Sequence, residues 1–322
     1  MHESDNNRMK GTNQVGDEMI GIIILNYNTE EKTTQCVSAI NDNVHEEYKI
    51  YLVDNASTDK SWSNLKRKYY KQKRIQFVAS ETNSGYSAGN NLGIRAALRD
   101  DCKYIMIVNP DVIFKNDVPT ILKRAFENDN LIGLAAPYIY LPNGSSGQLF
   151  RTKYNFKKAL FERKPLIYFR HFFHNADINI DMINVDEEAY IDGMVSGCCF
   201  MISKEALEMI GLLDENVFLY YEEYILEHKL RESKLKVKYI PQAKIIHNHV
   251  EEEERCNAFV NLHRYYSSLY YLKKYTNIKK WQFAMVYLED IILLCLRAIN
   301  DKEYRSVIGQ FKTKVYNLKR NT

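Results

Sequence analysis

The chain has 322 residues, which is enough for one large domain or two modest ones. Its hydrophobic and charged fractions, 45% and 26%, are those of an ordinary soluble globular protein, and a net charge of +3 gives no global field that would favour nucleic acid as a partner. The six cysteines form no CxxC pair, which argues against a zinc site and favours reduced thiols in a cytoplasmic protein.

Residues 1–18 are polar and have no apolar signal core, so we expect a disordered segment before the fold begins. From residue 19 to about 140, short apolar runs alternate with segments of helical periodicity. Strands that alternate with helices at this spacing pair in parallel, so the pattern predicts an α/β fold with a mostly parallel sheet flanked by helices. The expected strands are 19–25, 50–53, 75–79, 104–108 and 132–136, and the expected helices are 33–44, 61–70, 88–99 and 118–128.

The second half of the chain is less regular. Residues 150–173 mix aromatic and basic side chains and predict no single element. The small and apolar residues of 193–202 are expected to return to the sheet. Two short strands, 237–240 and 243–246, are expected around Pro241, and the expected helices are 204–210, 222–232 and most of the chain after 251.

The strand expected at 104–108 ends abruptly in Asn109-Pro110-Asp111. An acidic residue at the carboxyl end of a buried strand faces the crevice where open α/β sheets bind ligands. Asp111 is therefore a candidate ligand for a divalent metal that carries a diphosphate. The same residues also fit an ordinary strand-to-helix turn, in which Asp111 would be a helix N-cap.

Polar or acidic clusters follow other strand ends as well, at 26–28, 54–59 and 83–91 and, as an acidic pair, at 222–223. Because the carboxyl ends of strands in a doubly wound sheet share one edge, several of these segments should converge there. Successive strands that end in Asn or Asp favour a polar ligand bound with a metal. The motifs GxGxxG, GxxxxGK[ST] and GxSxG are missing, which argues against dinucleotide-binding dehydrogenases, P-loop kinases and hydrolases with a nucleophile elbow.

A series of motifs resembles the inverting family 2 glycosyltransferases of GT-A fold, in particular the bacterial branch that includes rhamnosyltransferases. In chain order they are ILNYN, LVDNASTD, NSGYSAGNNLGI, VNPDVIF, GCCFMISKEALEMIGLLDENVFLYYEE and PQAKIIH. The resemblance implies a GT-A catalytic domain at 19–250, with a donor half of about 19–140 and an acceptor half of about 141–250, followed by a helical extension, 251–322. It also implies transfer of a sugar from a nucleoside-diphosphate donor to an acceptor hydroxyl, with inversion, in bacterial surface polysaccharide or glycan assembly.

The resemblance assigns roles to individual residues. Glu222 and Glu223 match a Glu-Asp pair whose second carboxylate is the general base, although this chain has Glu223 where the family has Asp. Asp111 matches the last acidic position of the metal-binding motif. His247, in the pattern PxAxxxH, can complete the shell of a Mn²⁺ or Mg²⁺ ion, and His249 is a competing candidate. The expected donor is a UDP- or dTDP-sugar, lined by Asn26, Asn28, Asp54, Asn83, Gly85, Asn90 and Asn109.

Two alternatives stay open from the sequence. A sugar nucleotidyltransferase would also use a metal and a nucleotide, but the chain shows no glycine-rich, basic triphosphate loop near its first strand. A non-catalytic scaffold subunit that binds a nucleotide sugar is compatible with Glu223 and with Ile225, a position where many family members carry a further Asp.

The segment 271–322 is basic and rich in tyrosine, and its apolar runs predict helices with a basic face and an apolar face. Such helices can lie on an anionic membrane, which would place the protein at the inner face of the cell membrane, near a glycan or lipid-linked acceptor. Packing on the catalytic domain or in a homodimer interface is the alternative. No part is expected to cross the bilayer, because the most apolar stretch, 281–299, carries Glu289, Asp290 and Arg297.

Overall fold

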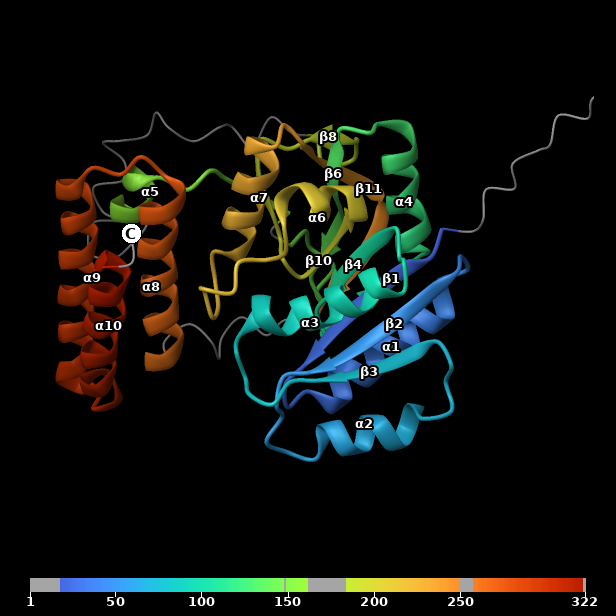
Figure 1. Cartoon of the computed structure of the whole chain (residues 1–322), viewed down its shortest axis with the longest axis horizontal. Helices are drawn as coiled ribbons and strands as arrows, with labels where there is room; N and C mark the ends of the chain where they lie inside the picture. Colours follow the sequence, from blue (N-terminus) through green and yellow to red (C-terminus); the bar gives the residue numbers. More distant parts are fainter. Residues whose placement is uncertain (1–17, 148, 162–183, 249–256, 321–322) are drawn as a thin grey trace, which may run out of the picture.

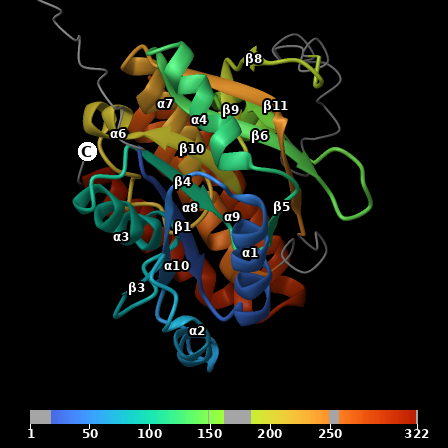
Figure 2. The ribbon, with the colours of Figure 1, turned by 90° about the vertical axis from the view of Figure 1, so that its right-hand side faces the viewer.

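The structure is a computed structural model that describes residues 18–147, 149–161, 184–248 and 257–320. Figure 1 shows an α/β part, coloured from blue to yellow, beside a bundle of orange and red helices. Figure 2 looks along the line that joins them, with the α/β part in front of the bundle. The expectations for residues 1–17 and for His249 lie outside the described residues.

The central sheet begins with four parallel strands in the order β3–β2–β1–β4 and continues with β10, β6, β11 and β5. Strand β10 is antiparallel to both β4 and β6, and β5 is antiparallel to β11. The prediction of a mostly parallel α/β sheet is therefore confirmed. The strands are β1 (Ile20–Asn26), β2 (Tyr48–Asp54), β3 (Ile75–Ala79), β4 (Tyr104–Val108), β5 (Val112–Phe114), β6 (Ile132–Tyr140), β10 (Cys199–Ser203), β11 (Lys236–His247) and, beside β11, β8 (Ala189–Tyr190).

Helices cover the sheet because their apolar stripes pack on its nearly continuous Ile, Val and Leu surface. Helix α3 packs on β1 and β2, whereas α4 packs on β6 and β11. Helix α6 packs on β10, and α7 contacts both α6 and β11. The helices of this part are α1 (Glu30–Asn43), α2 (Ser61–Tyr69), α3 (Tyr86–Arg99), α4 (Val118–Asn128), α6 (Lys204–Ile210) and α7 (Glu222–Glu232).

Two expectations about local structure were wrong. The strands expected on either side of Pro241 form one strand, β11, because the ladder to β6 shifts register between Ile240 and Lys244, where a residue without an N–H loses no ladder bond. Asp111 does not cap a helix, because the turn that contains it leads into β5; Asp117 is the N-cap of α4 and accepts a hydrogen bond from the Thr120 amide.

The segment that gave no prediction contains β7 (Phe150–Thr152), which pairs with β9 (Gly193–Val195) in a separate two-stranded sheet, and the short helix α5 (Phe156–Phe161). The helical extension is confirmed over its described residues. It is a bundle of α8 (Ala258–Tyr275), α9 (Lys280–Asn300) and α10 (Glu303–Arg320), with α5 packed on α9. Within the described ranges, no helix is long and apolar enough to cross a membrane.

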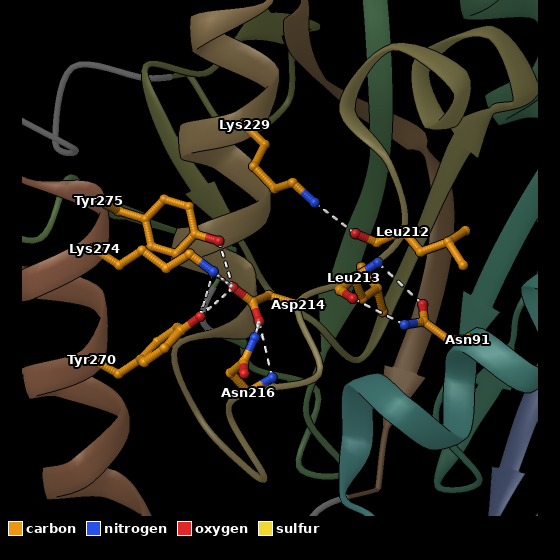
Figure 3. Close-up of polar contacts among 9 residues, drawn as sticks. All are labelled: Asn91, Leu212, Leu213, Asp214, Asn216, Lys229, Tyr270, Lys274 and Tyr275. Carbon is orange, nitrogen blue, oxygen red and sulfur yellow. Dashed lines mark hydrogen bonds and ion pairs between the residues drawn. The ribbon is translucent and has the colours of Figure 1, made fainter. Parts of the chain in front are cut away.

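The loop between α6 and α7, residues 211–221, joins the two parts of the molecule (Figure 3). On the α3 side, the Asn91 carboxamide donates to the Leu213 carbonyl at 2.9 Å and accepts from the Leu213 amide at 3.1 Å. On the α7 side, the Lys229 ammonium donates to the Leu212 carbonyl at 2.6 Å. These bonds fix the start of the loop against the α/β part.

On the side of the bundle, the Asp214 carboxylate accepts hydrogen bonds from Tyr275 and, at 2.8 Å, from Tyr270 (Figure 3). The Lys274 ammonium lies 3.3 Å from the same carboxylate. Burial by itself would raise the pKa of Asp214, but hydrogen bonds from Tyr275, Asn216 and Tyr270 outweigh it and hold the pKa at about 2. Asp214 is thus a buried anion that ties α8 to the loop.

We predict that Asp214→Asn lowers the free energy of unfolding by about 1–3 kcal/mol, because a neutral amide is a weaker acceptor than a carboxylate and its N–H₂ group cannot accept from the Lys274 ammonium. Asp101→Asn is the matched control, since Asp101 accepts from Lys204 with a side chain that is 72% exposed, and its effect should stay within about 0.5 kcal/mol. Urea denaturation of both variants at neutral pH measures the difference. Equal stabilities would contradict the role given to Asp214.

Candidate active site

The carboxyl ends of β1 and β2 meet at one edge of the sheet, where Asn26 pairs with Asp54 in register. The amide of the fully buried Asn26 donates to Asp54 at 2.9 Å, and its carbonyl oxygen accepts from Thr29 and Thr33. The Asp54 carboxylate also accepts from the backbone and hydroxyl of Ser57. Asn26 and Asp54 were both predicted to line the sugar donor. Their polar atoms bond to other groups of the protein and so fix the conformation of the two strand ends.

Asn28 joins the two loops that follow these strands. Its backbone has φ of 54°, which asparagine tolerates better than most residues. Its side-chain oxygen accepts from the Thr58 amide at 2.9 Å, and its nitrogen donates to the Thr58 hydroxyl at 3.1 Å. Asn28, which was also predicted to line the sugar donor, is exposed at this edge of the sheet.

The loop before α3 brings Asn83 and Gly85 to the same edge. Asn83 accepts hydrogen bonds from the Asn55 side chain at 2.9 Å and from the Gly85 amide at 3.1 Å. Gly85 has φ of 94°, and a Cβ atom there would lie 2.2 Å from the Phe218 carbonyl oxygen, so no other residue fits. Asn90, also predicted to line the donor, is buried and turns its amide back to the Tyr86 carbonyl at 3.0 Å.

The Asn109-Pro110-Asp111 turn lies at the end of β4, as predicted. Asn109 holds the turn through its backbone, since its amide donates to the Cys198 carbonyl at 2.8 Å and its carbonyl accepts from Val112. Strand β5 then pairs with the end of β11, with Val112 opposite His247. This pairing brings together two residues that are far apart in the sequence: His247 Nε2 lies 3.3 Å from Asp111 Oδ1.

The two side chains fit a divalent cation in part. A carboxylate and an imidazole that lie this close together suit Mn²⁺ as ligands, and both side chains are only partly exposed. Within the described ranges, no three His, Cys, Asp or Glu side chains gather at a metal-binding spacing. The Lys32 ammonium, 3.9 Å from Asp111 Oδ2, adds a positive charge beside the pair.

The acidic pair does not follow a strand end, as the sequence suggested, but begins helix α7 after the loop 211–221. The chain enters the helix through Tyr220 and Tyr221, whose φ values are 68° and 71°. Glu223 packs against Gly197, where a Cβ atom would come within 2.5 Å of its carboxylate oxygen. Its side chain also borders a cavity of about 10 Å³, room for roughly one water, between α7 and the sheet. Glu222 is buried beside it.

Burial raises the pKa of both carboxyl groups. For Glu222 the negative charge of Glu223 raises the pKa further. For Glu223 the rise is limited by hydrogen bonds from the backbone of Glu223 and Gly197 and by the positive charge of Arg151. The pair is therefore poised to hold a proton at a higher pH than an exposed glutamate would, which suits a general acid or base.

One short segment, Gly197-Cys198, connects the two halves of the site. Gly197 contacts Glu223, and the Cys198 carbonyl accepts from the Asn109 amide in the turn that carries Asp111. Burial raises the pKa of the Cys198 thiol to about 12, and the charges of Asp111 and Glu223 add to the rise, so both carboxylates act on this thiol. The segment thus contacts both the base candidate and the turn that carries the metal candidate.

Sequence reasoning missed the residues that come to the site from elsewhere in the fold. Lys32 could have been found, because the first turn of α1 follows a strand end on the same edge. Tyr86 donates to the Gly197 carbonyl at 2.7 Å, and burial followed by the charges of Glu222 and Glu223 raises its pKa. Arg151 belongs to the segment without periodicity, where no signal marked it.

Comparisons with known proteins identify the family of the chain. The model of the glycosyl transferase family 2 matches residues 21–211. The low-salt glycan biosynthesis hexosyltransferase Agl10 of Haloferax volcanii is 27% identical over 245 residues, which cover 73% of this chain and 69% of that protein. The glycosyltransferase GlyG of Streptococcus pneumoniae is 29% identical over 124 residues, 38% of this chain and 40% of that protein.

Solved structures show the same fold. GalNAc-T7, crystallised with UDP, GalNAc and Mn²⁺, gives a TM-score of 0.59 at 13% identity, over 80% of this chain and 48% of that one. TarS 1–349 of S. aureus in complex with UDP-GlcNAc gives 0.53 at 13% identity, over 85% of this chain and 71% of that one. The fold is thus of the GT-A type. Since the family model covers more than half of its length, the chain belongs to glycosyl transferase family 2.

Proposed function

We propose that the chain is an inverting glycosyltransferase that moves a sugar from a nucleoside-diphosphate donor to an acceptor hydroxyl. The observation that carries the proposal is the Gly197-Cys198 segment, with Glu223 on one side and the turn of Asp111 on the other. A single displacement needs a base for the incoming hydroxyl and a charged site for the leaving diphosphate. Here one short segment contacts both Glu223 and the turn that carries Asp111.

In the proposed reaction, the Glu223 carboxylate removes the proton of the acceptor hydroxyl while that oxygen forms a bond to the anomeric carbon. The bond between the anomeric carbon and the diphosphate oxygen breaks, and its electron pair leaves with the diphosphate. One displacement inverts the anomeric carbon and needs no covalent enzyme intermediate. The raised pKa of Glu223 makes its carboxylate a stronger base than an exposed one.

Asp111 and His247 would hold the divalent cation of the proposed site, Mn²⁺ or Mg²⁺. Such a cation supplies charge neutralisation for the leaving diphosphate. The chain itself contributes Lys32, whose ammonium stands 3.9 Å from Asp111 and can pair with a phosphate oxygen. The Asn109 backbone keeps the turn in place through Cys198.

The donor is proposed to be a UDP- or dTDP-sugar, and the UDP and UDP-GlcNAc of the two solved structures support this class. Its nucleotide would bind over the linked loops of Asn28 and Thr58 and the segment at Asn83. In this arrangement Asn26 and Asp54 act indirectly, by fixing the conformation of the strand ends. The name of the Haloferax volcanii relative supports glycan assembly, with a glycan or a lipid-linked sugar as the acceptor.

Glu223→Gln should lower kcat by at least about 100-fold, because an amide cannot take the hydroxyl proton. Donor binding should stay unchanged. Glu223→Asp, which restores the residue type of the family, should keep more activity than the glutamine variant. In the parent protein, kcat should fall as the pH drops through the raised pKa of Glu223, since protonation removes the base.

Transfer from a radiolabelled nucleotide sugar and calorimetric titration of UDP measure the two effects. Glu232→Gln, the same change on an exposed residue of α7, is the control and should behave like the parent. Full activity of Glu223→Gln would refute the base assignment. Donor binding without any turnover in the parent protein would instead favour a scaffold subunit.

Asp111→Asn should weaken Mn²⁺-dependent binding of UDP by at least about tenfold, because a neutral amide is a poorer ligand for a hard cation. Calorimetric titrations with Mn²⁺ and with a chelator give the metal-dependent share of the affinity. Asp101→Asn serves as the control, because Asp101 precedes β4 whereas Asp111 follows it. If chelation leaves the affinity of the parent unchanged, this pair of residues does not hold a metal.

A further inference from the structure

The outer face of helix α9 is apolar over its whole length. Its exposed large side chains recur at spacings of three and four residues, which places them on one side of the helix. They are between 45% and 71% exposed. In chain order they are Trp281, Met285, Leu288, Ile292, Leu296 and Ile299.

At about 100° per residue these side chains fall within an arc of roughly 80°, and from Trp281 to Ile299 they extend for about 27 Å. The remaining exposed residues of that stretch are Ala284 and Cys295. No charged side chain of α9 is exposed between Trp281 and Ile299. A helix face of this kind is unlike the solvated faces of soluble proteins, which carry charged residues.

The charged residues of α9 point the other way. Glu289 and Asp290 are buried, and Arg297 is half-buried and donates to the Tyr304 hydroxyl at 3.1 Å in α10. Leu293 and Leu294 fill the core of the bundle on the same side. Glu289, Asp290 and Arg297 argued against a membrane-spanning helix. Because none of them is exposed, the outer face of α9 carries no charge between Trp281 and Ile299.

Basic side chains gather at the Trp281 end of this face. The Phe156 ring of α5 contacts the Trp281 ring at 5.5 Å, which brings the exposed Lys157 to that end. Lys319 of α10 reaches the same end, because its ammonium lies 5.7 Å and 5.0 Å from the ring centroids of Phe283 and Tyr287. The exposed basic residues here are Lys157, Lys279, Lys280, Lys319 and Arg320.

We propose that the outer face of α9, with these basic residues, binds the surface of an anionic lipid bilayer. The helix would lie in the interface, with its aliphatic side chains among the acyl chains and Trp281 at the level of the head groups. Each Lys or Arg near an anionic surface adds to the attraction. The proposal concerns where the protein binds and does not depend on the proposed reaction.

A second copy of the chain is a weaker fit to this face. A contact of one helix with one helix would bury about 1,000 Å² in total, which is the lower limit for a stable interface. The basic end would also need an acidic counterpart. The exposed acids at the other end of α9, Asp301 and Glu303, alternate with Lys302 and Arg305, so that end has no excess of negative charge.

The test is co-sedimentation of the full chain with vesicles of phosphatidylcholine alone or mixed with phosphatidylglycerol. We expect binding to the mixed vesicles, weaker binding at high salt, and a blue shift of the Trp281 emission. The double variant Leu288→Asp/Ile292→Asp should bind at least about tenfold more weakly. Ser306→Asp/Gln310→Asp, which adds the same charges to exposed positions of α10, is the matched control and should lose much less.

Circular dichroism should show that both double variants keep the helical content of the parent. Absence of binding to the mixed vesicles, or equal binding of the parent and of Leu288→Asp/Ile292→Asp, would overturn the proposal. Light scattering after size exclusion completes the test. A parent dimer that the double variant converts to a monomer would assign the face to a second copy instead. Either result leaves the transfer reaction to be judged by its own assay.

Discussion

The hydrogen bonds that Asp214 accepts from α8 are the contact on which the arrangement of the site depends. A carboxylate taken out of water keeps its charge only if donors replace the lost hydration, and Tyr270, Tyr275 and Lys274 do so here. Removing one partner of a buried polar group costs roughly 1–3 kcal/mol, because the other partner is left without its hydrogen bond. The C-terminal bundle and the loop before the acidic pair therefore form one unit.

At the end of the same loop, next to α7, the backbone has a conformation that needs support from the bundle. Tyr220 and Tyr221 both have left-handed backbone, which costs roughly 1–2 kcal/mol for each residue. Helix α8 stabilises this conformation, since Ser267 donates to the Leu219 carbonyl at 2.9 Å and Arg264 lies 4.8 Å from the centroid of the Tyr220 ring. The bundle thus sets the direction in which α7 presents Glu222 and Glu223.

The two halves of the site are electrostatically different although they are neighbours. At the acidic pair, burial dominates and raises the pKa values, so a proton is held at a higher pH than on an exposed glutamate. At Asp111, the nearby His247 and Lys32 supply groups that suit an anionic ligand with a cation. A short segment with no charged side chain, Gly197-Cys198, separates them. Proton removal and charge neutralisation can therefore take place a short distance apart without cancelling one another.

The sequence by itself determined the strand ends and their chemistry. Apolar runs that stop at Asn26, Asp54 and Asn109 predicted both the sheet and its polar edge, because the periodicity of buried strands and the turn preference of Asn and Asp are local properties. The acidic pair at the start of α7 was recognised from its place in the series of motifs, directly after VFLYY. Pro241 misled the prediction, because a register shift with β6 is visible only when the two strands pair.

Only the tertiary structure decided which of these residues meet and in what environment. The 3.3 Å approach of His247 to Asp111 needs the pairing of β5 with β11, and the positions of Lys32 and Tyr86 need helices from other parts of the chain. The burial of Glu223, the partners of Asp214 and the uncharged outer face of α9 depend on packing between distant segments. Desolvation and long-range contacts are sums over the whole fold, so no local pattern encodes them.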